Sequence, residues 1–77
     1  MPSDLPTMTP VTSSNVESLG YQNGHMFVTF KGQKGKPPST YRYRDVPQNV
    51  FDAVKGNKSV GRALADYVTR FYKGEKL

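Results

Sequence analysis

The Asn23-Gly24 pair restricts the fold more than any other feature, because it lies between two strand-like segments. Asn-Gly favours the tight turns that join antiparallel strands. Segment 25–31 alternates, with Met26, Val28 and Phe30 on one face and Phe27, Thr29 and Lys31 on the other. Segment 16–21 alternates less clearly, because Gly20 interrupts it. The sequence therefore predicts an antiparallel hairpin.

A third strand is expected at 40–44, after a loop at 32–39 that is rich in glycine, proline and lysine. In this strand Tyr41 and Tyr43 would lie on one face, with Thr40, Arg42 and Arg44 on the other. A short strand with this composition extends the predicted hairpin into a three-stranded sheet.

The remaining sequence predicts two helices. Pro47 favours a helix start, and that helix would run to about Lys55 and stop at Gly56. Its apolar stripe would consist of Val50, Phe51 and Val54. Ser59 is a candidate N-cap for a second helix that would end near Gly74. The apolar residues of this helix recur at helical spacing and would face the core: Val60, Ala63, Leu64, Tyr67, Val68 and Phe71.

These elements predict an α+β fold in which a three-stranded antiparallel sheet is followed by two helices packed on one face. The chain has 77 residues, which suffices for one domain. We expect that domain to span 11–74. Residues 1–10 include three prolines and little apolar surface, so we expect a flexible tail there, and residues 75–77 should fray.

The composition indicates a basic intracellular protein. There are 11 lysines and arginines against 6 acidic residues, for a net charge of +5, and no cysteine. Segment 25–44 contains five of the basic residues and no acidic one. No apolar run is long enough for a membrane span or signal peptide. We therefore expect a cytoplasmic protein that does not bind membranes. The clustered positive charge fits an anionic partner, and it equally fits a role in solubility alone.

Catalytic chemistry has little support in the sequence. The single histidine, His25, has no Cys, His or acidic cluster beside it, and the six acidic residues are scattered. A metal site or a general acid–base pair needs such partners. We therefore expect no enzymatic activity, no metal and no cofactor.

The order of motifs resembles the KTSC domain family, over about residues 11–72. The motifs that carry this resemblance are Ser13-Ser14-Asn15-Val16, Leu19-Gly20-Tyr21, Met26 to Phe30, Tyr41-Arg42-Tyr43, Val46-Pro47, Val50-Phe51 and Ser59-Val60-Gly61. Segment 32–39 departs from the family, which usually has a shorter turn there. The resemblance implies a small domain that also occurs alone in bacterial and phage proteins. Association with a lysyl-tRNA synthetase implies RNA binding, by analogy.

The site we predict is a nucleic-acid interface, with RNA favoured over DNA. Its candidate residues are Lys31, Lys34, Lys36, Arg42 and Arg44 for phosphates, and Tyr41, Tyr43 and Phe27 for base stacking. Two arrangements are possible. Tyrosines facing the helices would be core and leave an outward basic row, whereas outward tyrosines would stack on bases. The need of a small core for large aromatic residues favours the first.

The alternative is a protein-interaction module, such as a phage-encoded modulator of a host protein. It would use the open sheet face or an exposed strand edge. Phe27, which alternation places on the outward face, would then contact a partner or a second subunit, and it could equally cap the core. We expect a monomer or a weak homodimer. Salt separates the two hypotheses, because phosphate binding weakens with salt and apolar docking changes far less.

Overall fold

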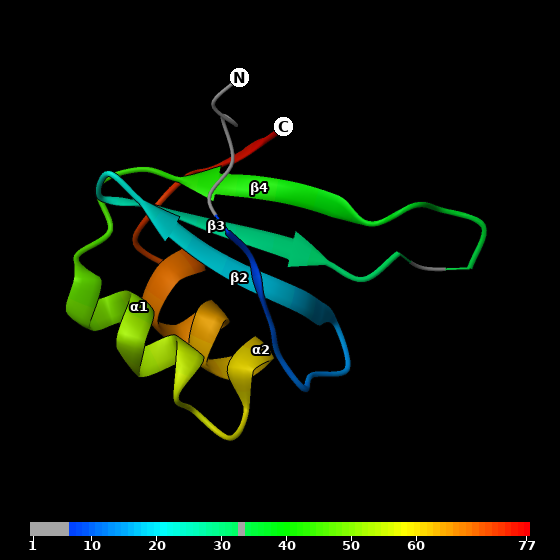
Figure 1. Ribbon diagram of the computed structural model, residues 1–77, viewed down its shortest axis with the longest axis horizontal. Coiled ribbons are helices and arrows are strands. Elements are labelled where there is room, and N and C mark those ends of the chain that lie inside the picture. Colours follow the sequence, from blue (N-terminus) through cyan, green and yellow to red (C-terminus); the bar gives the residue numbers. More distant parts are fainter. Residues whose placement is uncertain (1–6, 33) are drawn as a thin grey trace.

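The structure is a computed structural model that describes residues 7–32 and 34–77. Its central feature is the predicted hairpin of β2 (Val16–Gln22) and β3 (His25–Phe30), which are antiparallel (Figure 1). Asn23 and Gly24 form the turn with φ values of 54° and 81°. Both angles lie in the left-handed region that asparagine and glycine tolerate best. The Asn-Gly prediction is therefore confirmed.

β4 (Ser39–Tyr43) pairs antiparallel with β3, as the alternation at 40–44 predicts. The connection between β3 and β4 extends beyond the end of the sheet (Figure 1). We call it the lysine loop, after Lys31, Lys34 and Lys36.

The sheet has five strands, so the prediction of three was wrong. The added strands are β1 (Thr9–Pro10) and β5 (Gly74–Lys76), and the order is β1-β2-β3-β4-β5. β1 pairs with β2 in a segment expected to be a tail, of which residues 1–6 lie outside the described residues. β5 pairs with β4 where we expected a helix end and fraying. Strands of two or three residues are too short to show alternation, so pairing partners distant in sequence define them.

Gly74 allows β5 to lie close to β4. It is opposite Tyr43 in the strand register. A Cβ at position 74 would lie 2.7 Å from the Tyr43 ring, closer than side chains normally pack. Glycine therefore starts β5 where we expected it to end a helix.

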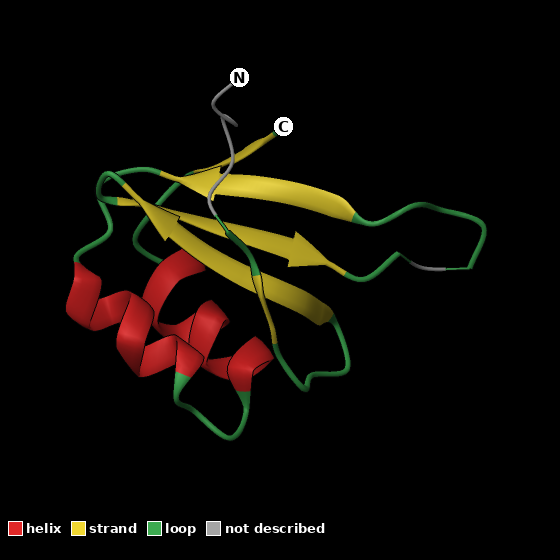
Figure 2. Ribbon diagram, in the orientation of Figure 1, coloured by secondary structure: helices red, strands yellow, loops and turns green. Residues whose placement is uncertain are grey.

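The helices lie on one face of the sheet, as predicted (Figure 2). They are α1 (Gln48–Lys55), α2 (Val60–Leu64) and η1 (Ala65–Thr69), a π-helical turn that continues α2. Pro47 is the N-cap of α1. Ser59 is the N-cap of α2, but its side chain makes no capping hydrogen bond.

The core lies between this helical layer and the sheet. Its fully buried large residues are Val16, Leu19, Met26, Val28, Val46, Val54, Leu64 and Val68. Tyr21 joins the layers, because its hydroxyl donates to the Val46 carbonyl and its ring lies 5.2 Å from that of Phe51. The predicted inward faces of β3 and α1 are therefore confirmed.

The π turn changes which residues of the last helix face the core. A π turn contains one residue more than an α turn, so it shifts the helix face that follows it. Val68 is buried and Tyr72 packs against the core, whereas Tyr67 is 48% exposed and Phe71 is 73% exposed. The prediction that Tyr67 and Phe71 complete the apolar stripe was therefore wrong.

Tyr43 makes the stability of this fold sensitive to alkaline pH. Burial raises the pKa of its phenol above 10.0, and Tyr41 adds to the rise. The unfolded chain therefore loses this proton at a lower pH than the folded chain, so stability falls as pH rises above about 10. We expect Tyr43→Phe to flatten the fall in unfolding free energy between pH 9 and pH 11, measured by urea denaturation. Tyr67→Phe, at an exposed position, is the control and should leave the slope of unfolding free energy against pH unchanged. Equal slopes in the native protein and both variants would contradict the expectation.

Candidate nucleic-acid interface

The strand register divides the predicted site residues between the two faces of the sheet. Phe27, Arg42 and Glu75 are register partners and share the face opposite the helices. Thr29 and Thr40 also share this outer face, and their hydroxyl oxygens lie 2.9 Å apart. Tyr41 and Tyr43 lie on the helix face, with Met26 and Val28.

The tyrosines belong to the core, as the favoured arrangement predicted. Tyr43 is 5% exposed. The Tyr41 ring packs edge-on against Phe30, with centroids 5.6 Å apart and an interplanar angle of 80°. Rings held in this way add to core stability. Tyr43 is not available to stack on bases, so the stacking role considered for it is withdrawn. Tyr41 is only partly buried, and its stacking role stays a prediction.

Phe27 is also buried, at 4% exposure, although it lies on the outer face. Of the roles considered for Phe27, this burial agrees with capping the core and not with open stacking or contact with a second subunit. Its register partner on β2 is Gly20, which brings no side chain to this face, and its partner on β4 is Arg42. The alternation placed Phe27 on the correct face, but it could not show that the ring is covered there.

Arg42 lies on the outer face of β4, Arg44 directly follows this strand, and both contact Glu75. Arg44 Nε is 2.6 Å from Glu75 Oε1, and Arg44 Nη2 donates to Oε2 at 3.3 Å. Arg42 Nη2 is 3.6 Å from Oε1, while its Nε is buried without a hydrogen-bond partner. One carboxylate thus serves two guanidinium groups, and the cluster keeps a net charge of +1. No sequence pattern indicated this contact, because Glu75 belongs to a segment that we expected to fray.

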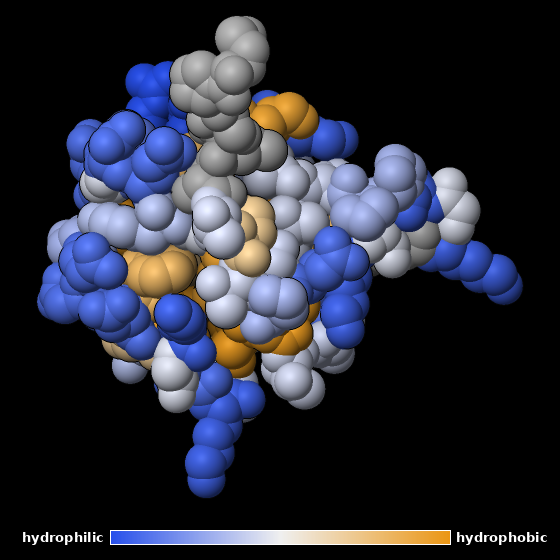
Figure 3. Space-filling view, in the orientation of Figure 1, coloured by the Kyte–Doolittle hydropathy of each residue, from blue (hydrophilic) through white to orange (hydrophobic). Residues whose placement is uncertain are grey.

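The lysine loop carries cations that are more accessible. Lys31, Lys34 and Lys36 are exposed, and none of them forms an ion pair with a residue that the structure describes. Lys31 Nζ donates to the Ser13 carbonyl, which keeps the ammonium near the sheet. The projecting loop is hydrophilic in the space-filling view (Figure 3). These positions are those predicted for phosphate contacts.

The two groups of cations lie at opposite ends of β4. A strand rises about 3.3 Å per residue, so Ser39–Tyr43 spans about 13 Å. Lys36 precedes β4, Arg42 lies within it and Arg44 follows it. We call this succession of Lys36, Arg42 and Arg44 the β4 track.

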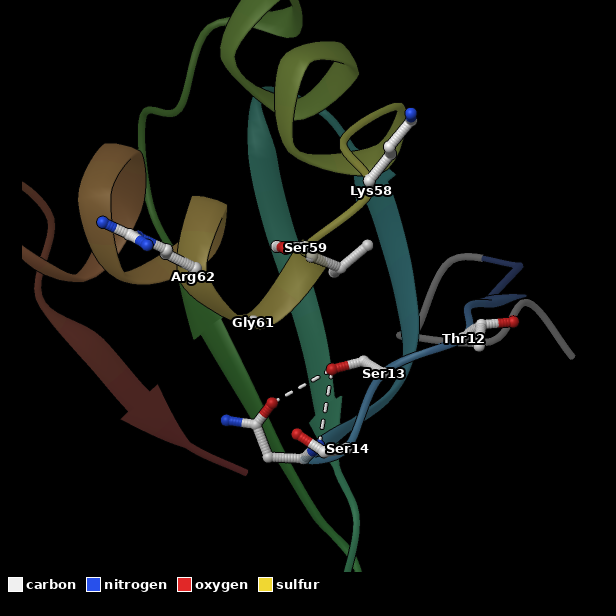
Figure 4. A pocket seen from close by; sticks show the side chains of 9 residues that line it. Thr12, Ser13, Ser14, Lys58, Ser59, Gly61 and Arg62 are labelled. Atoms are coloured by element: carbon white, nitrogen blue, oxygen red, sulfur yellow. Dashed lines mark hydrogen bonds between the residues drawn. The ribbon is translucent and has the colours of Figure 1, made fainter.

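A separate cleft of about 500 Å³ lies between the segment before β2 and the start of α2 (Figure 4). The Ser13 hydroxyl is already occupied there, because it donates to Asn15 Oδ1 at 3.0 Å. Figure 4 shows the Lys58 and Arg62 side chains extending away from Ser13 and Ser14. The cleft therefore does not gather its cations around one position.

The described residues contain no group of three His, Cys, Asp or Glu side chains that could hold a metal ion. His25 Nδ1 accepts a hydrogen bond from the Asp45 backbone at 3.3 Å, which ties the β2–β3 turn to the chain after β4. None of the helices in the described ranges has the length and apolar character needed to cross a membrane.

Comparison with known proteins agrees with this architecture. A family model described as the KTSC domain matches residues 12–72. A protein from Tsukamurella paurometabola is 36% identical over 55 residues, covering 71% of this chain and 78% of that protein. The crystal structure of a KTSC domain protein from Yersinia pestis superposes with a TM-score of 0.78 at 25% identity, covering 92% of this chain and 96% of that one. This chain therefore belongs to the KTSC domain family.

Proposed function

We propose that this protein is a non-enzymatic module that binds the phosphate backbone of single-stranded nucleic acid, with RNA as the preferred ligand. The observation that supports it best is the lysine loop, whose exposed Lys34 and Lys36 have no ion-pair partner among the described residues. Arg42 and Arg44 continue the positive charge along β4, reduced by Glu75. A cytoplasmic location is part of this proposal.

The expected binding is weak and tolerant of sequence. Lysine ammonium groups are flexible point charges, which contact phosphates without reading base edges. Binding releases the counterions condensed on the strand, so affinity falls as salt rises. With Tyr43 and Phe27 buried, the basic side chains carry most of the interaction.

Fluorescence anisotropy tests this proposal with labelled single-stranded RNA, single-stranded DNA and an RNA hairpin at several salt concentrations. Four phosphate contacts predict a slope of log K against log salt near −2.8, or about 50-fold weaker binding for a fourfold rise in salt. No binding at low salt would refute the proposal. Binding that does not change with salt would also refute it and would favour the protein-interaction alternative.

Glu75→Gln should increase the affinity for single-stranded RNA. The substitution removes the carboxylate charge that competes with phosphate for Arg42 and Arg44, while it preserves side-chain size. We expect about fivefold tighter binding near 0.1 M salt and a steeper salt dependence, as for one added phosphate contact. Anisotropy titrations measure both quantities.

Glu17→Gln is the matched control, because Glu17 is exposed on β2 and its loss raises the net charge by the same amount. If both variants bind more tightly to the same degree, the gain comes from overall charge. The arginine pair would then have no specific role.

A further inference from the structure

Phe71 is the most exposed of the large apolar side chains that the structure describes, at 73%. The π turn accounts for its position, because the extra residue brings Tyr72 to the core and leaves Phe71 in solvent. The Thr69 hydroxyl donates to the Ala65 carbonyl at 3.1 Å and so gives this backbone oxygen a hydrogen-bond partner inside the turn. π turns disturb the regular helix and occur frequently at functional sites. An aromatic ring exposed in this way suggests a ligand.

The surroundings of Phe71 indicate what that ligand is. A hollow of about 430 Å³ lies beside it, lined by Arg44, Asp45, Phe71, Tyr72, Lys73 and Glu75. The lining brings together residues that follow β4 and residues that lead into β5. A flat ring beside an arginine and a lysine suits a nucleobase whose phosphate is near the cations.

The charge around the hollow favours an anionic ligand. The segments 42–45 and 70–76 contain five basic and two acidic residues, for a net charge of +3. Of the two acids, Glu75 is held by both arginines, and Asp45 is exposed at the rim. Lys73 forms no ion pair with a described residue. A single nucleic-acid strand that follows the β4 track past Arg44 would therefore reach Phe71 with its phosphate charge compensated by basic side chains.

A protein partner fits this surface less well. The large apolar residues exposed in the described ranges are Tyr67, Phe71 and Leu77. Docking interfaces usually have a contiguous apolar centre from which charged residues are depleted. Here the ring has basic residues on both sides in sequence, Arg70 and Lys73, and four of the six residues that line the hollow beside it are charged.

We infer that Phe71 is a stacking platform for one base of a single-stranded nucleic acid whose phosphates follow the β4 track. This inference rests on the proposed function and adds a base contact to it. Stacking on Phe71 does not select one base, because every base has an aromatic face. The contact should therefore increase the affinity of the protein for a normal nucleic-acid strand relative to an abasic strand.

Phe71→Trp provides a direct probe, because the chain contains no tryptophan. We expect single-stranded RNA to quench this tryptophan fluorescence at the concentrations at which anisotropy reports binding. An abasic oligonucleotide of the same length and charge should bind without that quenching. Equal quenching by both strands, or no quenching by bound RNA, would overturn the inference.

Phe71→Ala tests the energetic consequence. The loss of one stacked base should weaken RNA binding about tenfold, while abasic binding and the salt slope stay unchanged. Tyr67→Ala is the matched control, because Tyr67 is an exposed ring in η1, close to Phe71 in sequence, and lies outside the lining of the hollow. It should change RNA affinity less than twofold.

The two proposals fail in different ways. If the native protein binds neither RNA nor abasic strand at low salt, the proposed function fails and the stacking platform fails with it. If RNA binds with the expected salt dependence but Phe71→Ala has no effect, only the stacking platform is refuted. Equal loss of affinity in Phe71→Ala and Tyr67→Ala would also refute it.

Discussion

Replacing Leu19 with alanine is expected to lower the free energy of unfolding by about 3 kcal/mol. Leu19 is fully buried in β2, opposite Val28, and belongs to the layer between sheet and helices. The loss combines the transfer free energy of the removed carbons with the cost of the cavity they leave. A chain of this size has about 4–12 kcal/mol of stability in total.

The melting temperature of Leu19→Ala should fall by about 12–24 °C, since each kcal/mol shifts a small domain by several degrees. Urea denaturation followed by circular dichroism measures the free energy, and a thermal scan measures the shift. Leu77→Ala is the matched control: the same side chain is removed, but Leu77 is 54% exposed. We expect a change below about 0.5 kcal/mol there. Similar losses in both variants would show that Leu19 does not lie in the core.

Removing two cations from the lysine loop should give the largest loss of binding. We expect Lys34→Ala/Lys36→Ala to bind single-stranded RNA about 25-fold more weakly near 0.1 M salt, and the salt slope to become shallower by about 1.4. Each lost lysine–phosphate contact lowers the number of counterions released on binding, and with it the binding affinity and its salt dependence. Both residues are exposed, so the fold should be unaffected.

The control for this experiment is Lys58→Ala/Arg62→Ala, near the start of α2. It lowers the net charge of +5 by the same two units and leaves the lysine loop unchanged. We expect less than a threefold loss of affinity. If the two double variants lose affinity equally, binding depends on total charge, and the lysine loop is not the interface. Melting temperatures of both variants verify that they remain folded.

Predictions from the sequence were most accurate where the evidence was local. The Asn23-Gly24 turn, the alternation of β3 and β4, and the apolar stripe of α1 each depend on neighbouring residues in the chain. These signals were sufficient for an α+β fold with helices on one face, and for the tyrosines as core. The lysine loop was likewise found from its composition, and the structure places its lysines at the surface.

The tertiary structure decided how the candidate site is completed. Glu75 reaches Arg44 across 31 positions of sequence, in a strand too short to be predicted from its own residues. Phe27 is buried because of what lies around it, which alternation does not report.

Phe71 is the clearest case. Its spacing from Val60, Ala63 and Leu64 is that of a core residue in an α-helix, and the π turn at 65–69 shifts the helix face so that Tyr72 takes the inward position. Both Phe71 and Tyr72 are aromatic, and hydrophobic periodicity favoured Phe71 for the core. The choice between them depends on how the helix end packs and joins β5. That is a contact between distant segments, which helical spacing alone does not encode.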